Sequence, residues 1–217
     1  MNKFILGGLA FVFVAGGVLL LVTGAVIYKR NYEQEARSQN LSGEVLPENK
    51  DRQSANSPGA DQEWLTEYTL INTQGKAVDS KDLKGQVHVV NFFFASCPSE
   101  CRLMNNQVEK LQREYGPQGV KFVSITCDPQ HDTPETLRNY ARLFDAPPDQ
   151  WMFLTSNDLT YISRIGAEVY ESHVAEKSHT KRLVLVDQQG KVAGKYIWDD
   201  PKEIQEMKQA MEKLLAK

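Results

Sequence analysis

The sequence has few cysteines and no concentration of positive charge. Three cysteines occur in 217 residues, which is too few for a scaffold held together by disulfides. No run of lysines or arginines is present, and the net charge is -3 with a pI of about 5.9. A nucleic-acid partner is therefore not expected. The placement of the three cysteines matters more than their number.

Charge is also absent from residues 4–28, which are mostly Leu, Val, Phe, Ala and Gly. This run is long enough to cross a bilayer as a helix, and it exceeds the core of about 7–15 residues typical of a cleaved signal peptide. No cysteine precedes Cys97, which argues against a lipoprotein anchor. We therefore predict a transmembrane anchor over residues 1–30, with cleavage of the segment as the alternative. Lys3 on one side and Lys29 and Arg30 on the other leave its orientation open.

Residues 31–62 contain few large apolar side chains. Such a segment cannot bury enough surface to fold by itself, so we predict a flexible polar linker. Residues 63–217 then form one domain, whose roughly 155 residues suffice for a hydrophobic core.

The pattern of apolar residues in this domain predicts alternating strands and helices. Residues 87–94 are nearly all apolar, as in a central strand buried on both faces. Met104, Val108, Leu111 and Tyr115 follow at helical spacing. Further strands are expected at residues 68–71, 76–78, 120–126, 151–155, 182–187 and 192–198, with helices starting near residues 133, 159 and 201. This order is typical of a thioredoxin-like α/β fold, here with an N-terminal transmembrane helix.

Cys97 and Cys101 directly follow the predicted central strand and open the next helix. Pro98 suits the first helical position, which places Cys97 at the N-cap, where free N–H groups and the helix dipole stabilise a thiolate. Cys101 lies four residues later on the same face. Two sulfurs so placed are suited either to a redox-active disulfide or to a soft-metal site. Their spacing alone does not decide between the two.

A proline is absent where thioredoxin-type oxidoreductases place a cis-proline opposite their cysteines, since none occurs between Pro148 and Pro201. His179 stands there instead, ahead of the last hairpin, and in this fold we expect its loop to face the cysteine pair. Two thiolates and an imidazole suit copper as Cu(I) or Cu(II). Zinc is the competing metal, although structural zinc usually takes four protein ligands. We therefore predict Cys97, Cys101 and His179 as metal ligands.

The remaining cysteine and histidines have less specific interpretations. We predict that Cys127 is a buried structural thiol, with a fourth metal ligand or an accessory redox group as alternatives. His173 is the rival of His179 as a ligand. His131 is expected near the site but solvated, and His88 is expected to pack at the start of the central strand.

Taken together, these residues resemble the Sco/SenC family over about residues 65–215. The resemblance rests on the following segments: residues 82–85, residues 92–98 with Cys101, Asp128-Pro129, residues 132–135, Trp151 with Leu154-Thr155, and His179 ahead of residues 183–187.

This resemblance implies a protein that binds copper through Cys97, Cys101 and His179. Such proteins assist assembly of the dinuclear copper site of cytochrome c oxidase by delivering copper, by reducing the cysteines of that site, or both. The implied partners are the copper-site subunit of the oxidase and another copper chaperone or a thiol reductant. The implied location is the cytoplasmic (inner) membrane, spanned once, with the C-terminal domain on the extracytoplasmic or periplasmic side.

Three functions follow as hypotheses. The first is a copper metallochaperone, a binding protein rather than an enzyme. The second is a thiol-disulfide oxidoreductase, in which Cys97 attacks a partner disulfide and Cys101 resolves the mixed disulfide. The third is a peroxidase, which needs an arginine beside the reactive thiolate; the nearest, Arg102, indicates no such arrangement. Replacing His179 discriminates among them, because copper transfer depends on it and disulfide exchange does not.

Overall fold

The computed structural model describes residues 63–98, 100–178 and 180–216. The predicted anchor, residues 1–30, and the predicted linker, residues 31–62, lie outside the described residues, as does His179. Within the described ranges, no helix is both long and apolar enough to cross a membrane.

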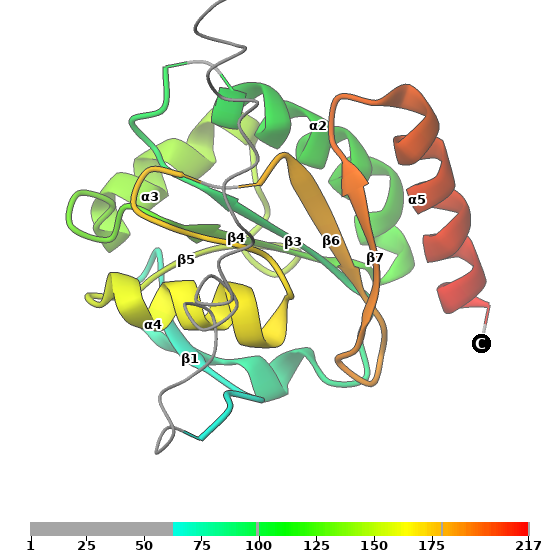
Figure 1. Cartoon of the computed structure of the whole chain (residues 1–217). Coiled ribbons are helices and arrows are strands. Elements are labelled where there is room, and N and C mark those ends of the chain that lie inside the picture. Colours follow the sequence, from blue (N-terminus) through cyan, green and yellow to red (C-terminus); the bar gives the residue numbers. More distant parts are fainter. Residues whose placement is uncertain (1–62, 99, 179, 217) are drawn as a thin grey trace, which may run out of the picture. The chain divides into compact units, whose positions relative to one another are not determined.

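The described chain is built around one seven-stranded sheet with the strand order β2-β1-β5-β4-β3-β6-β7 (Figure 1). Strand β4 runs parallel to both of its neighbours, β3 and β5, and all the other neighbouring pairs are antiparallel. The strands are β1 Thr69–Asn72, β2 Ala77–Asp79, β3 His88–Phe93, β4 Lys121–Thr126, β5 Trp151–Thr155, β6 Arg182–Val186 and β7 Val192–Ile197.

Strand β3 is the predicted central strand, and all six of its residues are buried. It lies between β4, which is parallel to it, and β6, which is antiparallel. Because side chains alternate across a strand, Val89 and Phe93 join the core on one face while Val90 and Phe92 join the core on the other. Burial on both faces explains why this segment is almost continuously apolar.

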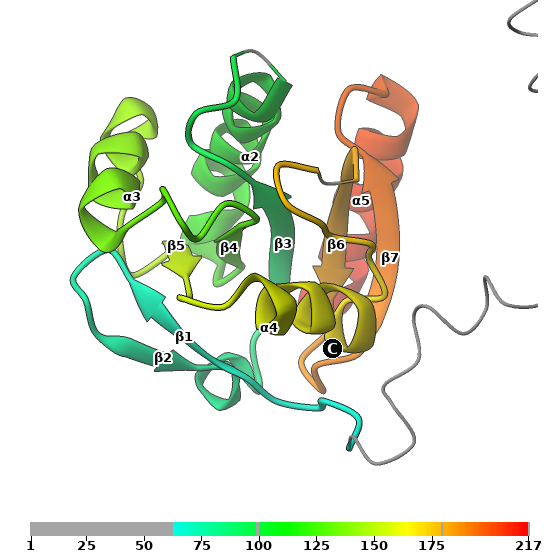
Figure 2. The same ribbon diagram turned by 60° about the vertical axis from the view of Figure 1, so that its left-hand side comes forward.

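Helices cover both faces of the sheet, giving three layers (Figures 1 and 2). Side chains of α2 (Glu100–Tyr115), α3 (Pro134–Ala141) and α5 (Pro201–Leu215) pack into the core on one face. The other face is covered by α4 (Leu159–Arg164), which continues as a π-helical segment. That segment is η6 (Ile165–Val169), and short 3-10 helices occur at η3 (Ser80–Leu83), η4 (Gly116–Gln118) and η5 (Arg142–Phe144).

A buried polar network connects helix α2 to the middle of the sheet. Asn91 of β3 donates from Nδ2 to Asn105 Oδ1 of α2 at 2.9 Å, and Asn105 donates from Nδ2 to the Tyr140 hydroxyl at 3.2 Å. On the sheet side, Ser124 donates to Asn91 Oδ1 at 2.7 Å and accepts from Trp151 Nε1 at 2.9 Å. Because polar groups must be paired when they are buried, this network fixes how α2 sits on the sheet.

The first hairpin, β1 and β2, forms one edge of the sheet and is joined to the rest of it by a long-range pairing. β1 pairs with β2 after a turn at Gly75, whose φ of 76° suits glycine. On its other side β1 pairs with β5 through Ile71↔Thr155 and Asn72↔Leu154. A segment near the start of the described chain is thereby joined to a strand from its middle.

Candidate metal and redox site

The chain leaves β3 through a turn that carries Cys97. The Cys97 N–H donates to the Phe94 carbonyl at 3.2 Å, and this turn delays the helix, so α2 begins at Glu100. The prediction that Pro98 occupies the first helical position and Cys97 the N-cap is therefore wrong. Cys97 Sγ nevertheless accepts the backbone N–H of Cys101 at 3.3 Å. This N–H belongs to the first turn of α2, whose donors have no partner within the helix.

The two thiols differ in their access to solvent. Cys97 is partly buried, whereas Cys101 has no exposed surface. Burial raises the pKa of the Cys101 thiol far above its usual value; a backbone hydrogen bond with Phe94 opposes this rise, and a hydrogen bond with the Cys97 side chain adds to it. The structure thus brings the predicted pair together as one accessible thiol and one buried thiol.

Asp132 anchors the turn that carries Cys97. Its Oδ2 accepts the backbone N–H of Ala95 at 2.9 Å and the Thr126 hydroxyl at 2.5 Å. The side chain is nearly inaccessible, and this burial raises the pKa of Asp132 although both hydrogen bonds oppose the rise. In the sequence Asp132 was part of the family resemblance, but its contact with the cysteine turn was missed. The sequence did contain a signal for this contact: Asp132 follows β4, and β3 and β4 are parallel, so both strands end at the same edge of the sheet.

Cys127 lies at the end of β4 with no exposed surface. Its N–H donates to the Phe93 carbonyl at 2.7 Å. Burial raises the pKa of its thiol to about 12, opposed by a backbone hydrogen bond with Ser178. The predicted buried thiol is confirmed, and an accessory redox role stays a prediction.

The chain on both sides of His179 contacts the cysteine-bearing segments. Before it, the Lys177 N–H donates to the Cys127 carbonyl at 3.2 Å. After it, Lys181 Nζ lies 2.6 Å from Glu100 Oε1, and Glu100 directly precedes Cys101. His179 itself is outside the described residues. Sequence reasoning missed Lys177, Lys181 and Glu100, because nothing in their local pattern marks such long-range pairs.

The structure confirms the predicted burial of His88 and the predicted exposure of His131, while the role of His173 as a rival ligand stays a prediction. His88 begins β3, is 4% exposed, and its Nδ1 lies 3.1 Å from the Gln86 carbonyl. His131 is exposed and its Nδ1 lies 2.8 Å from Asp128 Oδ1, while His173 is exposed. In the described part of the chain, no three or more His, Cys, Asp or Glu side chains gather in a way that could hold a metal ion. Cys127 therefore forms no such group with the cysteine pair, and the predicted set depends on His179.

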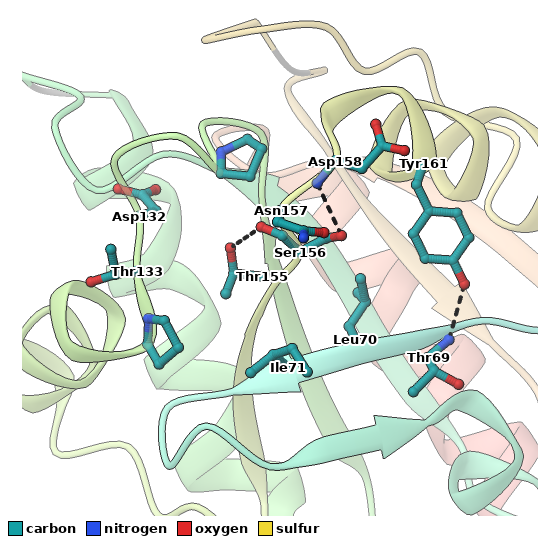
Figure 3. A pocket seen from close by; sticks show the side chains of 12 residues that line it. Thr69, Leu70, Ile71, Asp132, Thr133, Thr155, Ser156, Asn157, Asp158 and Tyr161 are labelled. Atoms are coloured by element: carbon teal, nitrogen blue, oxygen red, sulfur yellow. Dashed lines mark hydrogen bonds between the residues drawn. The ribbon is translucent and has the colours of Figure 1, made fainter.

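A pocket of about 650 Å³ opens beside the loop that holds Asp132 (Figure 3). Ile71 of β1, Thr155 at the end of β5, and Tyr161 of α4 contribute to its wall. The Tyr161 hydroxyl accepts the Thr69 N–H at 3.1 Å, which closes one end of the wall. Its lining includes no cysteine or histidine, so the pocket adjoins the anchor of the cysteine turn without being part of the thiol site.

Known proteins share this arrangement of strands and helices. A SCO1/SenC family lipoprotein from Bacillus anthracis superposes with a TM-score of 0.63 and 29% identity, covering 74% of this chain and 100% of that one. BsSco, described as a member of the Sco family of cytochrome c oxidase assembly proteins with a disulfide switch, gives 0.61 and 23%, covering 71% and 95%. Bradyrhizobium japonicum ScoI with copper bound gives 0.52 and 24%, covering 66% and 97%.

These likenesses confirm the predicted thioredoxin-like α/β fold of the domain in its Sco form. The family model for SCO1/SenC matches residues 56–216, which is most of the chain and all of the described sheet. The chain therefore belongs to the SCO1/SenC family.

Proposed function

We propose that this protein binds copper through Cys97, Cys101 and His179 and assists assembly of the dinuclear copper site of cytochrome c oxidase. Family membership supports this proposal, since one structural neighbour is a Sco protein with bound copper and another is described as an oxidase assembly protein. The finer assignment, a metallochaperone that hands over copper, is the first of two candidate roles.

The observation that carries the proposal is the contact between Lys181 and Glu100. Their 2.6 Å ion pair brings the chain two residues beyond His179 to Glu100, one of the three residues between the two cysteines in sequence. This contact supports the choice of His179 as the ligand, because His179 is two residues from Lys181 in sequence. His173, by comparison, has an exposed side chain, and the contacts of the described residues include none between it and the cysteine segment.

The donor atoms fit copper chemically. Thiolate sulfur is soft and favours Cu(I), and imidazole nitrogen accepts either oxidation state. The Cys101 thiol carries a proton at neutral pH because burial raises its pKa, so metal binding must release that proton. The buried side of the pair limits access of water, while the partly exposed Cys97 leaves a side open for ligand exchange with a partner.

We also infer that residues 1–30 anchor the protein in the cytoplasmic membrane and that the domain lies on the extracytoplasmic side. The uncharged run of residues 4–28 and the polar segment that follows support this inference. A domain tethered above a membrane meets a membrane enzyme at high effective concentration. Cysteine accessibility to a membrane-impermeant reagent in intact cells tests the orientation.

Copper stoichiometry tests the binding proposal. The full chain, purified in detergent and reduced, is loaded anaerobically with Cu(I) and separated from free metal. We expect one tightly held copper, lost or strongly weakened in Cys97→Ser, Cys101→Ser and His179→Ala. His173→Ala is the matched control, because it removes an exposed imidazole from the same segment. If the wild type retains no copper, or if His173→Ala loses it while His179→Ala does not, the assignment is wrong.

The second candidate is a thiol-disulfide oxidoreductase, and the unequal burial of the two cysteines favours it. The accessible Cys97 thiolate would attack a partner disulfide, forming a mixed disulfide and releasing one partner thiolate. Cys101, after losing its proton, would attack Cys97 Sγ and release the second partner thiolate. The partner is then reduced to its dithiol, Cys97 and Cys101 form a disulfide, and an external dithiol must reduce it again. Under this role His179→Ala keeps disulfide exchange, whereas under copper delivery it abolishes transfer.

A further inference from the structure

Lys177 occupies a backbone position that normally favours glycine or asparagine. Residues 175–178 form a tight turn closed by two hydrogen bonds. The Ala175 N–H donates to the Ser178 carbonyl at 3.1 Å, and the Ser178 N–H donates to the Ala175 carbonyl at 3.0 Å. Lys177 has a φ of +48° in this turn. That left-handed conformation is unfavourable for a residue with a Cβ, so contacts elsewhere must hold Lys177 in place.

The side chain of Lys177 faces a buried carboxylate. Asp128 is completely inaccessible, and its Oδ2 finds no hydrogen-bond donor among the residues that the structure describes. Lys177 Nζ lies 3.6 Å from this oxygen. A buried carboxylate oxygen without a hydrogen bond is strongly destabilised unless a cation lies nearby. The other oxygen, Oδ1, lies 2.8 Å from His131 Nδ1, and Lys177 is the cation beside Oδ2.

The main chain of Lys177 is held against the same segment, because its N–H donates to the carbonyl of Cys127, the residue before Asp128. Lys177 is thus fixed at two points, one on its backbone and one on its side chain. We propose that Lys177 is a positioning residue for the copper site: it fixes the chain two residues before the proposed ligand His179. This inference rests on the proposed function, since it takes His179 as a ligand.

Lys181 offers a matched comparison on the other side of His179. It also pairs with a carboxylate, Glu100, but both side chains are largely exposed, at 58% and 39%. An exposed pair contributes little, because water and salt screen it. In the Lys177 pair the lysine is also exposed, at 44%, but its partner Asp128 is fully buried. Loss of charge at Lys177 is therefore expected to affect the site far more than loss at Lys181.

The test compares Lys177→Met with Lys181→Met in the full chain in detergent. Methionine keeps the length of the side chain and the backbone penalty but removes the charge. Each variant is loaded with Cu(II) and examined by its sulfur-to-copper absorption band and electron paramagnetic resonance, and copper retention is measured against a competing chelator. We expect Lys177→Met to shift the spectra towards those of His179→Ala and to weaken retention about tenfold or more. Lys181→Met should keep the wild-type spectra. Lys177→Arg should keep them too, because arginine retains the positive charge.

A glycine variant separates positioning from folding. Lys177→Gly removes the charge but relieves the left-handed backbone strain, so it should fold even if Lys177→Met does not. A folded Lys177→Gly protein with altered spectra supports the proposal. Wild-type spectra and retention in either folded variant would overturn it, as would failure of both variants to fold. If the wild type itself binds no copper, the proposed function fails first, and the two failures are thereby distinguished.

Discussion

The carboxylate of Asp132 accepts the backbone N–H of Ala95 and so ties the loop after β4 to the turn that carries Cys97. The same oxygen accepts the hydroxyl of Thr126 at the end of β4. One buried carboxylate therefore determines where the first cysteine stands relative to the sheet.

Removing this anchor should destabilise the domain. Asp132→Ala leaves the Ala95 N–H and the Thr126 hydroxyl without their acceptor in a buried site, at a cost of about 1–3 kcal/mol in the free energy of unfolding. Urea denaturation followed by fluorescence measures this. Asp149→Ala, at an exposed carboxylate, is the control and should stay within about 0.5 kcal/mol of wild type. Equal losses of unfolding free energy for the two variants would show that the hydrogen bonds of Asp132 do not stabilise the domain.

Stability should also depend on pH through Asp132. Burial raises its pKa in the folded state above the unfolded value of 3.8, so the protonated form is favoured by folding. The contribution of Asp132 to the free energy of unfolding is fully present below pH 3.8. It is lost as the pH rises through the raised pKa of the folded state. The free energy of unfolding of wild type minus that of Asp132→Asn should therefore decrease over this window. A difference that is flat or increases with pH would contradict the raised pKa.

The three thiols should react with alkylating reagents at very different rates. At about pH 8 roughly one Cys127 in ten thousand carries a thiolate, given a pKa of about 12, and Cys101 is likewise buried and protonated. Brief treatment of the reduced, folded protein with iodoacetamide, followed by peptide mass spectrometry, should label Cys97 first. Labelling in denaturant provides the control, because all three cysteines should then react alike. Early labelling of Cys127 in the folded protein would be inconsistent with its burial.

The polar network under helix α2 should contribute to stability through the Tyr140 hydroxyl. Tyr140→Phe keeps the ring stacked on Phe93 but leaves the Asn105 amide without its acceptor, which should cost about 1–3 kcal/mol of unfolding free energy. Tyr161→Phe is the matched control, since its hydroxyl accepts the exposed Thr69 N–H, which water can satisfy instead. Calorimetry or urea titration of both variants measures the difference. A larger loss for Tyr161→Phe would contradict the importance of the network.

Local patterns in the sequence were sufficient to predict the strands and helices. The apolar run of residues 87–94 became β3, and the stripe from Met104 to Tyr115 became the buried face of α2. Both elements could be predicted because the spacing of apolar residues indicates which faces of a strand or helix are buried. The start of α2 was missed because the Phe94–Cys97 turn decides it, and helix boundaries depend on such local hydrogen bonds.

The surroundings of the cysteines could be predicted only in part. The pair itself was recognisable because both residues lie in one segment. The contacts of Asp132 with Ala95 and of Lys181 with Glu100 join residues far apart in the chain. Surface lysines and aspartates have no periodic signature, so the partners of such residues emerge only once the strands are placed side by side.

The pairing of β1 with β5 has a consequence for the way the chain is made. Ribosomes synthesise β1 early, yet its partner Thr155 emerges much later, on the order of ten seconds at typical elongation rates. Leu70 and Tyr68, both buried in the finished domain, lie uncovered during that delay. Until residues 151–155 emerge, the nascent chain therefore exposes the edge of β1 that does not pair with β2, together with these apolar side chains.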